Sequence, residues 1–106
     1  MQWPSTADGD VFRRLQADDF DFELPCEIDF NVDFEAWPPA EQAIHWLHAN
    51  YAQAKIYPPT EDFNGYVQFK VHTPLTYELV VHVQEFVSAA LGRFGGVCES
   101  WGVLHG

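Results

Sequence analysis

Histidines are the first side chains to consider as metal ligands. His45 and His48 lie three residues apart in a segment expected to be helical, a spacing that allows both to hold one ion. A metal site needs three or four ligands, and no nearby cysteine or carboxylate pattern completes such a set. His72, His82 and His105 are isolated along the chain. We therefore interpret the histidines as structural or surface residues and predict neither a metal site nor a cofactor.

Carboxylates are far more numerous, with 16 Asp and Glu residues in the chain. Acid–base catalysis requires a carboxyl group with a raised pKa beside an ionised one in a cleft. Asp29 and Asp33 are instead expected on the solvent side of a strand, where water keeps both ionised. No nucleophile-elbow, zinc-protease, phosphate-loop or dinucleotide-binding motif occurs. The residues therefore predict a protein that is not an enzyme.

The overall charge is strongly acidic, because only five Lys and Arg residues balance the carboxylates and the net charge is −11. Eight carboxylates lie between Asp18 and Glu35, a stretch that has no basic residue. Nucleic acids and anionic lipids are bound through clustered Lys and Arg, so we expect no direct contact with either. A protein with a basic surface is the natural electrostatic partner, and simple solubility is the alternative explanation.

The hydrophobic pattern predicts where these side chains are placed. From Cys26 to Phe34 apolar and polar residues alternate strictly, which is typical of a strand with one buried face. Helices are expected over 7–17 and 40–53, and residues 1–7 are expected to be frayed. Further strands are expected over 55–57, 67–72 and 97–104. Cys26 and Cys98 would begin the first and last strands, beyond disulfide reach of each other, so both are expected to be free thiols.

The last helix is expected to begin at Thr73-Pro74, a hydroxyl cap followed by proline, and to end at Gly95-Gly96. Its predicted buried stripe consists of Leu75, Leu79, Val83, Phe86, Ala90 and Phe94. We expect Leu79, Val83 and Phe86 to cover the apolar side of the first strand, which carries Ile28, Phe30 and Val32.

The order of elements is one helix followed by β-α-β-β-α-β. This order predicts an α+β fold, a ferredoxin-like sandwich with an antiparallel four-stranded sheet, two helices on one face and an additional N-terminal helix. The last strand would then lie antiparallel beside the first. No linker divides the chain, so a single domain over 1–106 is expected. No apolar run reaches the roughly 18 residues of a membrane span and no signal-peptide pattern occurs, so a cytoplasmic location is expected.

The solvent side of the first strand and of its neighbour, the last strand, is the best candidate for a partner-binding site. We expect Asp29 and Asp33 to contribute from the first strand, and Glu99 and Trp101 from the last. A large aromatic side chain among carboxylates on an open sheet face suits protein binding. In the alternative interpretation, Trp101 packs beneath the N-terminal helix and only stabilises the fold.

Two segments resemble the RraB family, regulators of ribonuclease E activity. DGDVFRRLQADDFDFELPCEIDFNVDFE is similar to the family's first helix, acidic loop and Ile-Asp-Phe strand, and HTPLTYELVVHVQEFVSAALGRFGGVCESWGVL to its long helix, turn and last strand. The resemblance covers residues 8–104. Glu99-Ser100-Trp101 stands where the family has Asp-Gly-Trp, and the long acidic C-terminal tail of well-known members, expected to aid partner binding, has no counterpart in this sequence.

The resemblance implies a cytoplasmic bacterial regulator with a ferredoxin-like fold that binds ribonuclease E or a related RNA-processing complex and modulates RNA turnover. Arginine-rich segments of ribonuclease E would be the natural docking targets. The alternative hypothesis is a small-ligand-binding or metal-binding domain, or a minor enzyme, on the same scaffold, since this fold hosts many functions. Association into a homo-oligomer through the exposed sheet face is also left open.

Overall fold

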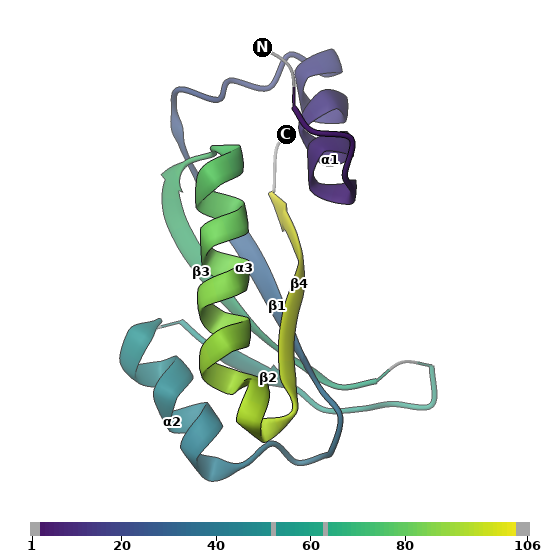
Figure 1. Ribbon diagram of the computed structural model, residues 1–106, viewed down its shortest axis with the longest axis vertical. Coiled ribbons are helices and arrows are strands. Elements are labelled where there is room, and N and C mark those ends of the chain that lie inside the picture. The colour runs from purple at the N-terminus through teal and green to yellow at the C-terminus, as the bar shows by residue number, and fades with distance from the viewer. Residues whose placement is uncertain (1–2, 52, 63, 104–106) are drawn as a thin grey trace.

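The computed structural model describes residues 3–51, 53–62 and 64–103. Within these residues the chain forms three α-helices, one short 3-10 helix and four strands (Figure 1). The helices are α1 (Ala7–Ala17), α2 (Glu41–Asn50), α3 (Tyr77–Leu91) and the 3-10 helix η1 (Gly92–Phe94). The strands are β1 (Pro25–Phe34), β2 (Lys55–Tyr57), β3 (Tyr66–Pro74) and β4 (Gly96–Val103). The predicted α+β class and the predicted order of elements are therefore confirmed.

The four strands form one antiparallel sheet in the order β2-β3-β1-β4. The last strand lies antiparallel beside the first, as predicted. The register between them shifts once, because Val32 pairs with Cys98 whereas Asn31 pairs with Ser100. Glu99 is therefore the extra residue of a β-bulge. Each β4 residue after Glu99 lies on the face of the sheet opposite to the one that uninterrupted alternation would give it.

The alternation of β1 divides the sheet into a buried face and a solvent face. Ile28, Phe30 and Val32 are fully buried, and Phe30 stacks on Phe69 of β3 with ring centroids 5.3 Å apart. Helices α2 and α3 both lie on this buried side, as Figure 1 shows for α3 in front of β1 and β3. The core residues that they contribute are Ala43, Leu47, Val80, Val83, Val87 and Leu91.

The buried stripe of α3 differs from the prediction. Val80, Val87 and Leu91 have no exposed surface, whereas Phe86 is 45% exposed and Leu79 is only partly buried. Both stripes have helical spacing, so periodicity alone does not choose between them. Phe86 packs beside the core instead of in it, against Trp46 of α2 with ring centroids 5.5 Å apart.

The predicted start of α3 was also wrong. Strand β3 continues through Thr73 and Pro74, which pair with Cys26 and Pro25 of β1. The capping residue is Thr76, whose Oγ1 accepts a hydrogen bond of 3.1 Å from the Leu79 N–H. Proline is tolerated at Pro74 because the strand ends there.

This cap gives a direct test of the boundary. Thr76→Ala is expected to lower the free energy of unfolding by about 1 kcal/mol, since it removes the acceptor for one unpaired helix N–H. Thr73→Ala, the matched change three residues earlier, is expected to cost less than about half of that amount. Urea unfolding of both variants measures the difference, and a larger loss at Thr73 would return the helix start to that residue.

Helix α1 lies at the end of the sheet near the start of α3, and the segment before it is ordered from Trp3 onward (Figure 1). Thr6 caps α1 by accepting a hydrogen bond of 3.1 Å from the Gly9 N–H. Trp3 packs on Phe12 with ring centroids 5.4 Å apart, so the expected fraying of this lead-in is corrected for the described residues. No helix in the described part of the chain is long and apolar enough to span a bilayer.

Candidate partner-binding site

The solvent face of the sheet, called here the open face, is lined by polar residues of neighbouring strands. The odd-numbered residues of β1 lie there, and each pairs with an even-numbered residue of β3. The pairs are Glu27 with His72, Asp29 with Lys70, Asn31 with Gln68, and Asp33 with Tyr66. Because α2 and α3 occupy the other face, no described helix covers these side chains.

A row of amides fixes the middle of the open face. The Gln68 side-chain amide donates to Asn31 Oδ1 over 3.0 Å, and the Asn31 amide donates to Ser100 Oγ over 3.1 Å. These hydrogen bonds join β3, β1 and β4. The open face is therefore a pre-formed surface, which lowers the entropic cost of binding a partner.

The two predicted aspartates on this face have different surroundings. Lys70 Nζ lies 2.5 Å from Asp29 Oδ1 and 3.8 Å from Glu27 Oε1. The hydrogen bond to Asp29 raises the pKa of Lys70, so this cation remains charged beside the two carboxylates. Asp33 is exposed and forms no ion pair with the described residues. Asp33 is thus the carboxylate of this face that is available to a basic partner.

Trp101 does not lie beside these aspartates, and its predicted place on the open face is corrected. It pairs with Phe30 on the buried side, where its ring lies 5.4 Å from that of Phe12. Its Nε1 donates a hydrogen bond of 2.8 Å to Asp8 Oδ1 of α1. The bulge at Glu99 is the reason, because one extra residue turns Trp101 to the other face. The structure therefore matches the alternative interpretation of this residue.

Glu99 itself, the fourth predicted residue, lies in the bulge and is exposed. Of the four predicted residues, Asp29 and Asp33 share the open face, Glu99 lies at the irregularity of the neighbouring strand, and Trp101 belongs to the packing under α1. The predicted group is therefore only partly brought together.

The structure adds an aromatic pair that the sequence did not reveal. Tyr57 of β2 and Tyr66 of β3 pair on the open face and stack with ring centroids 4.9 Å apart. Tyr66 pairs with Asp33 of β1, and Asp33 pairs in turn with Val97 of β4, which is 41% exposed. We call Tyr57, Tyr66, Asp33 and Val97 the end row. Aromatic and aliphatic side chains around a carboxylate suit a protein-binding surface.

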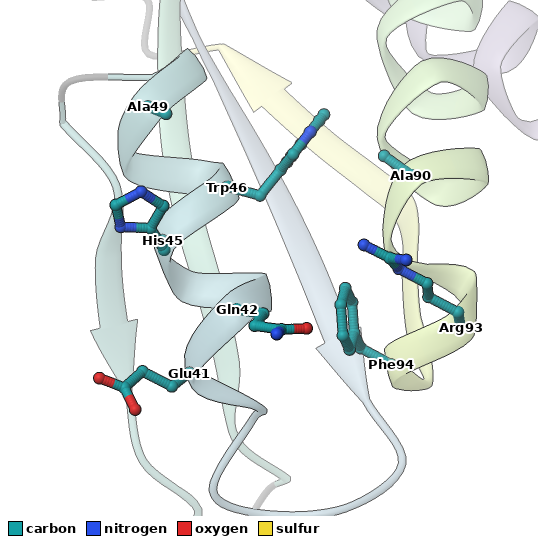
Figure 2. Close-up of a pocket in the computed structure, with 8 residues that line it drawn as sticks. All are labelled: Glu41, Gln42, His45, Trp46, Ala49, Ala90, Arg93 and Phe94. Carbon is teal, nitrogen blue, oxygen red and sulfur yellow. The ribbon is translucent and has the colours of Figure 1, made fainter.

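A hollow of about 910 Å³ lies on the other side of the molecule, between α2 and the end of α3. Figure 2 shows Trp46 and Gln42 pointing from α2 toward Ala90 and Phe94, whereas His45 and Glu41 point away. The guanidinium of Arg93 lies 4.7 Å from the centre of the Phe94 ring. The walls are thus mainly apolar, with one cation, and they contain no pair of groups arranged for acid–base catalysis.

Both cysteines are free thiols, as predicted. Burial raises the pKa of Cys98 to about 12, and the nearby charges of Asp33 and Glu99 add to this effect. Burial also raises the pKa of Cys26. Since the thiolate is the reactive form, neither residue has the environment of a nucleophile. Among the described residues no three His, Cys, Asp or Glu side chains are grouped to hold a metal, and His105 lies outside them.

Comparison with known protein families assigns the chain to a family. The family model described as Regulator of ribonuclease activity B, RraB, matches residues 5–103. No curated protein and no solved structure was found to match. The match spans α1, the whole sheet and both helices that cover it, and it confirms the resemblance seen in the sequence. The chain therefore belongs to the RraB family of ribonuclease regulators.

Proposed function

We propose that this protein is a non-enzymatic regulator that binds ribonuclease E, or a related RNA-processing complex, and modulates its activity. The match of residues 5–103 to a family of ribonuclease regulators carries the proposal. The net charge of −11 supports a partner with a basic surface, because complementary charge accelerates association and selects among partners. The same charge argues against direct binding of RNA, whose phosphates would be repelled.

The open face is the proposed docking surface. The open face carries three carboxylates on β1, Glu27, Asp29 and Asp33, and two lysines. Lys70 pairs with Asp29, and Lys55 of β2 lies 5.6 Å from the centre of the Tyr57 ring, so the charge of the face is negative by a small margin. The stacked pair of Tyr57 and Tyr66 supplies apolar area next to the charge. Glu99 borders the same surface from β4, whereas Trp101 is assigned to the fold.

The architecture supports two further parts of the proposal. We propose a ferredoxin-like sandwich with α1 added, folded as a single domain over 1–106. The strand order β2-β3-β1-β4, with two helices on one face, supports this assignment. A bacterial cytoplasmic location follows from the proposed partner. Self-association through the open face would compete with the partner for the same residues, so the oligomeric state of the free protein is part of the test.

One observation favours the alternative of a small-ligand-binding domain. The hollow between α2 and α3, about 910 Å³, has the size of ligand pockets in other proteins. Mass spectrometry of the protein under native conditions would show a retained small molecule if this alternative were correct. An unliganded mass together with ribonuclease binding would favour the regulator.

Association kinetics with purified ribonuclease E test the regulator directly. Asp33→Asn keeps the size of the side chain and removes its charge, so the association rate is expected to fall about 2- to 5-fold and to depend less on salt. Glu85→Gln removes the same charge from an exposed position on α3, which covers the other face of the sheet, and is the control. Asp29 is not used because its replacement would also break the contact with Lys70.

The outcomes are distinct. An RNA-cleavage assay should show that the wild-type protein alters the activity of ribonuclease E, and a gel shift should show no binding to single-stranded RNA at physiological salt. Absence of any association with ribonuclease E, or tight RNA binding by metal-free protein, would contradict the proposed function.

A further inference from the structure

A second hollow, of about 780 Å³, lies between α1 and the start of α3 and is not part of the open face. Six of the ten residues that line this hollow are aromatic or acidic. These residues are Trp3, Phe12, Phe22, Tyr77, Glu23 and Glu78, and we call this hollow the aromatic pocket. No Lys, Arg or His occurs among the described residues that line it.

Three of the rings form a compact group. The ring centroids of Trp3 and Phe12 are 5.4 Å apart, those of Trp3 and Phe22 are 5.6 Å apart, and those of Phe12 and Phe22 are 5.8 Å apart. The Tyr77 ring lies 5.8 Å from that of Phe12. Phe12 is buried at the base, while Trp3, Phe22 and Tyr77 are only partly buried. Ring surface is therefore accessible from solvent.

The wall formed by Trp3 is held in place by specific contacts. Arg13 Nη1 donates to the carbonyl oxygens of Trp3 and Pro4, over 2.9 and 3.2 Å. Gly9 makes this close approach feasible, because a Cβ at this position would lie only 2.0 Å from the Pro4 carbonyl oxygen. Glycine is a poor helix former, but at this position it allows the preceding segment to fold back and complete the pocket.

The two charged residues that line the aromatic pocket are both negative, and Arg13, the cation that contacts the backbone of its wall, is paired with Asp10. Glu23 and Glu78 are exposed at its edge. A shallower hollow beside it shares Gln16, Phe22 and Glu23 and is also lined by Asp19 and Asp21. The hollow between α2 and α3 differs, because Arg93 already lies over an aromatic ring there. An accessible group of rings with an acidic edge has the chemistry that attracts a cation.

We propose that the aromatic pocket binds an arginine side chain from a basic segment of a protein partner. A planar guanidinium stacks on aromatic faces and pairs with carboxylates, so the rings and the two glutamates act on the same group. This inference rests on the proposed function, because it assumes a basic protein partner, and it adds a second contact apart from the open face. It also specifies the chemical group that is recognised.

The test uses the full chain and a nona-arginine peptide as the probe, with a nona-citrulline peptide as its uncharged counterpart. Any polycation is attracted to a chain of net charge −11, so binding alone decides nothing and matched variants are required. Trp3→Leu and Phe22→Leu remove a ring but keep an apolar side chain, and each is expected to weaken binding about 5- to 10-fold. Trp46→Leu, in the hollow between α2 and α3, is the matched control for loss of a ring.

A second pair of variants, both on α3, tests the removal of one negative charge. Glu78→Gln is expected to weaken binding about 3-fold, whereas Glu85→Gln, two turns further along α3 and exposed, is expected to weaken it less. Isothermal titration at about 0.15 M salt gives the affinities, and circular dichroism melts confirm that each variant is folded. Amide and indole NMR shifts on adding the peptide should be largest at Trp3 and Phe22.

The inference is overturned if nona-citrulline binds as tightly as nona-arginine, or if Trp3→Leu and Phe22→Leu behave like Trp46→Leu. Failure of the proposed function gives a different result, namely no association with ribonuclease E by any folded form. Retained ribonuclease binding that is sensitive to Asp33→Asn but not to Trp3→Leu would refute the pocket and leave the open face in place.

Discussion

Replacing Trp101 by alanine is expected to lower the free energy of unfolding by about 3 kcal/mol, the lower end for loss of a large aromatic side chain, because the indole is only partly buried. The lost contacts are the packing on Phe12 and the hydrogen bond from Nε1 to Asp8. Both hold α1 against β4. Since Trp101 lies on the buried side of the sheet, the association step that depends on Asp33 of the open face is expected to be unchanged in the folded fraction.

A smaller change separates packing from hydrogen bonding. Trp101→Phe keeps an aromatic ring but leaves Asp8 without this donor, and it is expected to cost about 1 kcal/mol. Asp8 also accepts a hydrogen bond of 3.2 Å from the Gln84 amide, so it ties α1 to α3 as well as to β4. A double-mutant cycle between Trp101→Phe and Asp8→Ala measures the coupling by urea unfolding. Unchanged stability of Trp101→Ala with much weaker partner binding would restore Trp101 to the partner-binding site.

The parts of the fold that the sequence predicted well are those encoded by local periodicity. The alternation from Cys26 to Phe34 defined β1 within one residue, and the expected bounds of α1 and β2 agree with the structure. In each case the pattern of apolar and polar residues within the segment is enough to predict the element, whereas the residues that pack on it are known only from the structure. The pairing of the first and last strands also followed, because the order of helices and strands leaves few topologies.

The features that were missed depend on contacts between distant segments. The bulge at Glu99 is defined by the pairing of β4 with β1, and the residue pattern of β4 did not predict it. The bulge determines which face of the sheet carries Trp101 and so removes this residue from the predicted site. The pair of Tyr57 and Tyr66 is visible only once β2 is placed beside β3. Trp3 packs on Phe12 and Phe22. The residues before α1 have no clear hydrophobic period, so the sequence did not predict these contacts.

The same limit applies to α3, where two apolar stripes share one helix. Val80, Val87 and Leu91 are buried in place of the predicted Leu79 and Phe86, Val83 belongs to both stripes, and both stripes satisfy helical spacing. The cap at Thr76 also places the start of the helix three residues later than the predicted cap at Thr73. Bulky Phe86 then packs on the flank against Trp46.

Leu91→Ala is therefore expected to destabilise the protein by about 3 kcal/mol, because Leu91 has no exposed surface and its truncation leaves a cavity in the core. Phe86→Ala removes a larger side chain, yet it is expected to cost only about 1 kcal/mol, since Phe86 is 45% exposed and loses mainly its contact with Trp46. Urea denaturation with unchanged m-values measures both on the same helix. The original stripe predicts the reverse order, with Phe86 the costlier loss. A Phe86→Ala variant less stable than Leu91→Ala would mean that α3 is rotated about its axis and that the hollow beside α2 has different walls.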